Sequence, residues 1–289
     1  MKPARGPIIG RILLIALLVF LAAGCDRSGS GESVFYQPQE RDALISAEQW
    51  ETIFTALAER GTRTLVIQWT RYGDADFGGP EGWLQEAVEQ AADAGLRVRI
   101  GLYGDPDWFR RLTDDTPRAR LMEEAVGASL RQAGEWSHWR DREAFVGWYF
   151  PGELAGSAFT DAADRRAAFN HLVALRVELD ADLAVSSYFQ GEQDPRDFAE
   201  WQDDLARAGL RVWVQDGAGV AELPDARRRA YLHALPCRVG IIEEHFRQTS
   251  GPGEAFQAEP VPRAPRTGCH ERGVFSLRYL PEAGGLLLP

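Results

Sequence analysis

A recurring order of helix, glycine and strand constrains how this 289-residue chain can fold. Three segments each combine an alanine-rich helix end, a glycine and a β-rich run, and the pentamer Ala-Gly-Leu-Arg-Val occurs in two of them: Ala58–Ile67, Ala94–Ile100 and Ala208–Val214. Glycine ends a helix in the left-handed conformation without the steric penalty of a Cβ atom. Helices that alternate with strands in this way predict an α/β fold built on a parallel sheet.

Eight apolar runs supply the strands of that sheet. They are continuously apolar rather than alternating, which is typical of parallel strands covered on both faces. The expected strands are Val34–Gln37, Thr64–Thr70, Leu96–Tyr103, Ala144–Phe150, Leu183–Phe189, Leu210–Gln215, Arg238–Glu243 and Gly273–Arg278. Helical periodicity fills most of the gaps, as in Leu121–Ala133 and Arg165–Leu179, and Ser46 with Gln49 forms a capping box.

Eight β/α units over residues 34–289 predict a (β/α)8 TIM barrel, which takes about 250 residues. A doubly wound open sheet is the alternative, but no glycine-rich phosphate fingerprint follows the first strand. Two units are irregular. Four prolines make Ser250–Gly268 a loop rather than a helix, and the eighth helix is expected to be short or missing before Pro289.

The N-terminus reads as a targeting segment. Three basic residues precede the 12-residue apolar run Ile12–Ala23, which is shorter than the ~20 residues that span a membrane. Leu21–Cys25 resembles a bacterial lipobox. We therefore expect residues 1–24 to be a lipoprotein signal peptide, Cys25 to be lipidated and residues 25–33 to form a flexible tether. A plain signal peptide with a chance cysteine is the alternative.

This anchor indicates where the domain works. Two acyl chains hold a protein stably on a bilayer, so we expect a periplasm-facing lipoprotein, with the inner or outer membrane left open. The net charge of −11 repels phosphate backbones and argues against nucleic acid as a partner. An oxidising compartment permits a disulfide between Cys237 and Cys269, which precede neighbouring strands ~4.8 Å apart. Two buried free thiols are the alternative.

Chemistry in a TIM barrel is built at the carboxyl ends of the strands. In this chain those positions collect carboxylates, amides and aromatic rings, a mixture that suits a sugar because rings stack on its faces and polar groups bind its hydroxyls. The candidate substrate-binding residues are Gln68, Trp69, Tyr103, Trp148, Tyr188, Gln215 and Asp216.

Two glutamates, after the fourth and seventh strands, are the candidate catalytic pair. Retaining glycoside hydrolysis needs two carboxyl groups ~5–5.5 Å apart, one protonated and one ionised. Glu153 would be the acid/base and Glu244 the nucleophile. Glu243 is the alternative nucleophile, because a one-residue shift exchanges the inward and outward faces of a strand. Either carboxylate could instead cap a helix or pair with arginine.

The order of these motifs resembles a bacterial family of glycosidase-like TIM barrels, the domain of unknown function 4434. The resemblance runs from about Phe35 to Tyr279 and implies glutamates after strands four and seven. The chain departs from the pattern at Gly152 and Ile242, where asparagine is common. The motifs are Gln68-Trp69-Thr70, Gly101-Leu102-Tyr103, Gly147-Trp148-Tyr149 with Pro151 and Glu153, Ser187-Tyr188-Phe189, Gln215-Asp216-Gly217, and Glu244 with Phe246.

The sequence thus predicts a membrane-anchored, carbohydrate-active barrel, a retaining glycoside hydrolase with a glycan substrate. The alternatives are a non-catalytic glycan-binding barrel in envelope or exopolysaccharide assembly, and a lipoprotein scaffold without a ligand. No cofactor or metal is expected, since the five histidines lack metal-binding spacing and no G-x-S-x-G elbow occurs. The sugar, the linkage and the oligomeric state are not indicated.

Overall fold

The computed structural model describes residues 31–251, 254, 256–263 and 268–288. The expected signal peptide, the lipidation site Cys25 and most of the tether lie outside these residues. Contacts define Gly31–Pro289 as one compact unit. Among the described residues, no helix has the length and apolar character needed to cross a bilayer.

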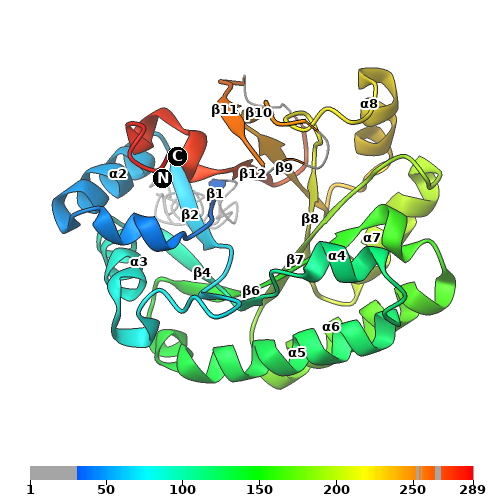
Figure 1. The fold of residues 1–289 in the computed structure, drawn as a ribbon, viewed down its shortest axis with the longest axis horizontal. Coiled ribbons are helices and arrows are strands. Elements are labelled where there is room, and N and C mark those ends of the chain that lie inside the picture. Colours follow the sequence, from blue (N-terminus) through cyan, green and yellow to red (C-terminus); the bar gives the residue numbers. More distant parts are fainter. Residues whose placement is uncertain (1–30, 252–253, 255, 264–267, 289) are drawn as a thin grey trace, which may run out of the picture. The chain divides into compact units, whose positions relative to one another are not determined.

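Eight parallel strands close into a barrel, which confirms the TIM-barrel prediction (Figure 1). Around the barrel the order is β1-β2-β4-β6-β7-β8-β9-β12, and β12 pairs with β1 to close it. Each strand overlaps one of the eight expected runs. The strands are β1 Glu32–Tyr36, β2 Thr62–Ile67, β4 Arg97–Gly101, β6 Phe145–Ala155, β7 Leu183–Tyr188, β8 Arg211–Gln215, β9 Gly240–Glu244 and β12 Arg272–Phe275.

Helices lie outside the barrel and connect most strands (Figure 1). They are α2 Ala47–Glu59, α3 Trp83–Asp93, α4 Trp108–Thr113, α5 Arg118–Glu135, α6 Ala162–Leu179, α7 Pro195–Arg207 and α8 Asp225–Ala234. Ser46 caps α2 by accepting from Gln49 N, as the capping box predicted. The glycines that end three helices all have positive φ, at 98° for Gly61, 85° for Gly95 and 89° for Gly209.

The two irregular units are as expected, and two small strand pairs add to the barrel. In the described part of the loop after β9, a small antiparallel pair forms from β10 Phe246–Gln248 and β11 Ala258–Pro260. After β12 the chain makes two short 3-10 turns, Leu277–Tyr279 and Pro281–Ala283. A second small pair forms from β3 Arg71–Tyr72 and β5 Tyr103–Gly104, which directly follow β2 and β4 in the chain. Both additions therefore lie at the carboxyl ends of the strands.

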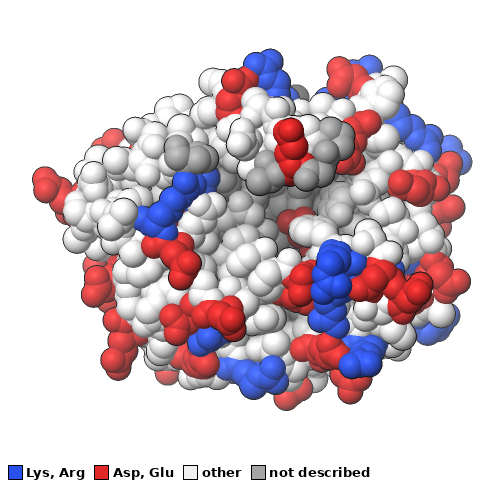
Figure 2. Space-filling view, in the orientation of Figure 1, with Lys and Arg blue, Asp and Glu red and all other residues white. Residues whose placement is uncertain are grey.

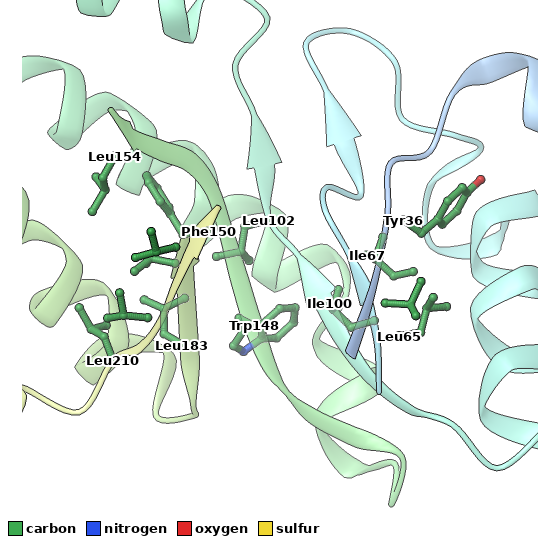
Figure 3. Close-up of a cluster of buried hydrophobic side chains, with 14 of the residues drawn as sticks. Tyr36, Leu65, Ile67, Ile100, Leu102, Trp148, Phe150, Leu154, Leu183 and Leu210 are labelled. Carbon is green, nitrogen blue, oxygen red and sulfur yellow. The ribbon is translucent and has the colours of Figure 1, made fainter. Parts of the chain in front are cut away.

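The core has two layers because each strand is buried on both faces. A cluster inside the barrel comprises Phe35, Val66, Tyr149, Ala184, Trp213 and Ile242. A larger cluster fills the space between the strands and the helices, and Figure 3 shows part of it, including Leu65, Ile100, Trp148 and Leu183. The inner cluster forms the floor beneath the open end of the barrel.

A disulfide joins Cys237 and Cys269 just before β9 and β12, with their Cα atoms 5.3 Å apart. It closes a loop with a sequence separation of 32 residues. For a loop of this size the cross-link stabilises the fold by about 3–4 kcal/mol, chiefly by restricting the unfolded chain.

Replacing both Cys237 and Cys269 by serine should lower the free energy of unfolding by about 3–4 kcal/mol. Urea denaturation of the wild type and the double variant without reductant measures the difference. Reductant should destabilise the wild type and leave the double variant unchanged. An unchanged midpoint in the double variant would show that the bridge adds no stability.

Candidate functional site

A cavity of about 580 Å³ opens at the carboxyl ends of the strands and contains most of the predicted site residues. Seven of the nine candidates line it: Gln68, Trp69, Tyr103, Glu153, Tyr188, Gln215 and Glu244. Figure 2 shows acidic side chains in and around the hollow at the centre of this face. Side chains from six barrel strands therefore meet in one pocket, as the fold requires.

Glu153 lies in a bulge of β6. Phe150 pairs with Val185 and Leu154 with Ser187, so four residues of β6 span the length of two on β7. Such a bulge turns a side chain away from its regular direction. Here it presents Glu153 to the pocket.

Two amide side chains hold the Glu153 carboxyl. Gln68 Nε2 donates to Glu153 Oε1 at 3.3 Å, and Gln215 also hydrogen-bonds the carboxyl. Burial by the pocket walls raises the pKa of Glu153 to about 7, although these two hydrogen bonds act in the opposite direction. Gln68 Oε1 is buried and has no hydrogen-bond partner among the described residues, so it can accept a hydroxyl from a ligand.

Glu244 ends β9 and is 1% exposed. The backbone N–H groups of Gly219 and Val220 donate to its Oε2 at 2.6 and 3.3 Å. Burial raises its pKa to about 7, the charges of Asp216 and Glu153 act in the same direction, and the two N–H groups lower it. Glu153 and Glu244 therefore interact electrostatically, and near neutral pH the pair favours holding one proton between them.

The alternative residue Glu243 faces away from the pocket. Its carboxylate binds Arg272, with 3.3 Å between Glu243 Oε2 and Arg272 Nη2, on the outer side of the barrel. Strand alternation explains the difference, because Ile242 and Glu244 share the inner face. The pocket therefore contains Glu244 and not its neighbour.

Two predicted substrate contacts do not line the pocket. Trp148 is 1% exposed and packs between the barrel and the helices beside Phe145, so the prediction that it binds substrate is wrong (Figure 3). Tyr149, the next residue, is the one that points into the barrel. Asp216 lies beneath the loop that holds Glu244, where its Oδ1 accepts from Ala218 N and Glu244 N. Asp216 thus positions the nucleophile candidate and is not a wall of the pocket.

Steric crowding explains why position 152 is glycine, although the family resemblance suggests asparagine there. A Cβ atom on Gly152 would lie 2.5 Å from the Phe150 ring and 2.9 Å from Trp108. Both rings line the pocket, and Trp108 Nε1 donates to Glu153 O at 2.9 Å. The aromatic rings therefore occupy the space that a side chain at position 152 would need.

Sequence reasoning missed several residues that shape the site. Tyr149 lies on the barrel floor, where its hydroxyl is 2.6 Å from Ser186 Oγ. Arg263, from the loop after β9, donates to the backbone carbonyls of Glu244, Ala218 and Phe246. The motif Gly147-Trp148-Tyr149 contained a signal for Tyr149, whereas nothing local marks Arg263.

The buried carboxyl of Glu244 makes stability depend on pH. Its pKa is raised in the folded state, so the folded protein binds more protons than the unfolded chain between about pH 4.5 and 7. The free energy of unfolding therefore falls as pH rises through this window. Above pH 7 the full cost of burying the ionised Glu244 carboxylate is present.

The Glu244→Gln variant removes the cost of burying a charged carboxylate and keeps an oxygen that can accept from the N–H groups of Gly219 and Val220. We expect its melting temperature at pH 8 to exceed that of the wild type, by roughly 2–4 °C for each kcal/mol gained. The difference should shrink below pH 5, and thermal unfolding across pH 4–9 measures it. A difference that does not vary with pH would contradict the raised pKa.

Among the described residues, no group of three or more histidine, cysteine, aspartate or glutamate side chains could hold a metal ion. What the site offers is a pair of coupled carboxyl groups, side-chain amides and aromatic surfaces. Buried, coupled carboxyl groups are of the kind that can exchange protons and act as nucleophiles.

Comparison with known proteins shows the family of the chain. The model of the domain of unknown function DUF4434 matches residues 32–266, and the chain belongs to this family. It is also similar to the uncharacterized protein YbcH of Escherichia coli strain K12, with 32% identity over 277 residues, 89% of this chain and 92% of YbcH.

Solved structures share the fold. A provisionally assigned alpha-L-fucosidase from Bacteroides thetaiotaomicron has a TM-score of 0.54 at 12% identity, covering 80% of this chain and 79% of that one. The spore cortex-lytic enzyme SleL of Bacillus cereus has a TM-score of 0.50 at 9% identity, covering 89% of this chain and 73% of that one. At these identities the likeness shows the barrel fold alone.

Proposed function

We propose that this chain is a retaining glycoside hydrolase of the bacterial cell envelope, with Glu153 as acid/base and Glu244 as nucleophile. One observation carries the proposal: two carboxyl groups from β6 and β9 line the same pocket, and each has its pKa raised to about 7. Retaining hydrolysis needs one protonated and one ionised carboxyl, and a coupled pair with these pKa values supplies that state near neutral pH.

The hydrogen bonds favour the assignment of roles. Glu244 Oε2 accepts two backbone N–H groups, which stabilise a carboxylate and leave Oε1 for attack on the anomeric carbon. Glu153 then donates its proton to the glycosidic oxygen as the carbon–oxygen bond breaks, and the alcohol leaves. In the second step Glu153 takes a proton from water, the water oxygen bonds to the anomeric carbon, and the ester to Glu244 is released.

The rest of the pocket supports a sugar as the ligand. Trp69, Tyr103 and Tyr188 provide ring surfaces, while Gln68 and Gln215 provide amides beside the carboxyls. The barrel is also a fold that such chemistry uses, since an alpha-L-fucosidase is by name a glycoside hydrolase. We further propose that lipidation at Cys25 anchors the domain facing the periplasm, which metabolic labelling with a fatty acid and a Cys25→Ser variant would test.

A non-catalytic glycan-binding barrel is the second candidate. Gly152 and Ile242 favour it, because both lack the amides that the family resemblance suggests at these positions. Ile242 lies on the apolar barrel floor, and the rings around Gly152 leave no room for an amide there.

The test is hydrolysis by the wild type of a panel of aryl glycosides and neutral, N-acetylated and acidic polysaccharides. We expect release of reducing ends from at least one member, with NMR showing that the first-formed sugar keeps its anomeric configuration. Inversion would remove the nucleophile role of Glu244. Binding without any hydrolysis would favour the second candidate.

A further inference from the structure

Three large aromatic side chains stand exposed around the mouth of the pocket. Tyr72, Phe109 and Phe256 are 38%, 51% and 55% exposed, and all three line the cavity. Only six large apolar side chains are this exposed among the described residues, so half of them gather at this one opening. Exposed apolar surface concentrated at a pocket marks a place where a ligand binds. We call these three residues the outer rings.

Each outer ring rests on another ring deeper in the pocket wall. Tyr72 stacks on Trp69 with 4.6 Å between ring centroids, and Trp69 is itself held by a hydrogen bond to Pro38 O. The rings of Phe109 and Tyr188 meet edge to face, with 6.2 Å between their centroids. Phe256 contacts Phe246 at 5.6 Å. Each contact joins an outer ring to a ring of the pocket wall, so the outer rings extend the aromatic surface of the pocket outward.

The outer rings stand at different points around the barrel mouth. Tyr72 rests on Trp69 after β2, Phe109 meets Tyr188 at the end of β7, and Phe256 meets Phe246 after β9. Three steps around the barrel separate β2 from β9, and two separate β7 from β9. All three rings line the cavity that holds Glu153 and Glu244, so a ligand that contacts Phe256 and another outer ring spans the mouth of that cavity.

The charge of the pocket limits what such a ligand can be. Its described lining contains four acidic residues, Asp105, Glu153, Glu222 and Glu244, against the single basic residue Arg228. Arg228 already binds Asp225, and Asp105 binds Arg111, each at 2.9 Å, so the three glutamates carry the excess of acidic groups. The excess of carboxylates disfavours a polyanionic chain, whereas uncharged sugar rings can stack on the aromatic surfaces.

We infer that the outer rings bind sugar units on both sides of the cleaved bond, so that the enzyme cuts neutral polysaccharide chains internally. This inference rests on the proposed function and names its substrate class. Stacking on two of these rings should contribute roughly tenfold in affinity for a chain that spans the pocket.

Affinity gel electrophoresis tests the binding directly. The probes are hydroxyethylcellulose, galactomannan and xyloglucan as neutral polymers, and alginate and polygalacturonate as acidic ones. We expect retardation of the wild type by at least one neutral polymer and by neither acidic one. The double variant Phe109→Ala/Phe256→Ala should bind that polymer roughly tenfold more weakly. The matched control Leu44→Ala, at a site 88% exposed and absent from the pocket lining, should bind like the wild type.

The outcomes separate this inference from the proposed function. Retardation by no neutral polymer, or equal retardation of the double variant, would overturn the inference even if the wild type cleaves a short glycoside. Retardation that depends on the outer rings, with no hydrolysis of any polymer, would support polysaccharide binding by these rings and contradict the proposed hydrolase activity. For a polymer that is cleaved, products of intermediate length at early times support internal cutting, and release of single sugars alone would overturn it.

Discussion

Replacing Glu244 with glutamine is expected to lower kcat/KM for a cleavable glycan by a factor on the order of 10⁴ or more. An amide cannot form the covalent ester with the anomeric carbon, so the first step of the reaction is lost. The backbone N–H groups of Gly219 and Val220 can still bind the amide oxygen, so the loop should keep its position. Initial rates on the glycan identified by the hydrolysis panel measure the effect.

The neighbouring carboxylate offers a matched control for this variant. Glu243→Gln changes the same functional group one residue away, on the outer face of β9, where it binds Arg272. We expect it to keep activity within about twofold while lowering the melting temperature, because Arg272 loses a charged partner that is 2% exposed. Equal losses of activity in Glu243→Gln and Glu244→Gln would indicate a general disturbance of β9 and would contradict a specific role for Glu244.

A smaller replacement tests the nucleophile role directly. The Glu244→Gly variant removes the carboxylate and leaves space where a small anion such as azide can attack the anomeric carbon. With an activated aryl glycoside, we expect azide to restore turnover and to give a glycosyl azide of inverted configuration, visible by NMR. An active variant without azide, or an azide product of retained configuration, would contradict a direct attack by Glu244.

The strands could be predicted from sequence because burial on both faces produces continuous apolar runs. The same property concealed the direction of individual side chains. In Gly147-Trp148-Tyr149 every residue is apolar or aromatic, so no polar neighbour indicates which ring enters the barrel, and Trp148 was assigned to the wrong face. Glu243 and Glu244 are ambiguous in the sequence because they are adjacent, identical and both buried, although they lie on opposite faces of β9.

Contacts between distant segments were beyond the sequence pattern. The bulge that turns Glu153 into the pocket depends on the pairing of β6 with β7, which no local motif specifies. Arg263 reaches the carbonyl of Glu244 from 19 residues away, through a proline-rich loop that the sequence identified only as irregular. The candidate residues could therefore be named from strand ends, whereas the groups that position them required the folded chain.

The Glu153→Gln variant should lose activity in a way that depends on the leaving group. An acid is needed most when a poor leaving group, such as a sugar hydroxyl, must be protonated as it departs. We expect kcat/KM for the natural glycan to fall by roughly 10²–10⁴-fold, the usual range for one general acid. For an aryl glycoside with an acidic phenol, the first step should remain fast, and a burst of phenol should precede slow hydrolysis of the glycosyl-enzyme.

The pH dependence gives this variant a second signature. In the wild type, kcat/KM should fall above the pKa of the protonated Glu153 and below that of the ionised Glu244, giving a bell near pH 7. The alkaline limb reports the loss of the Glu153 proton, so it should disappear in a variant that lacks this carboxyl group. The acidic limb should stay close to its position in the wild type, because Glu153 is already protonated and uncharged over the pH range in which Glu244 ionises. An alkaline limb that persists in Glu153→Gln would assign the proton donor to another group.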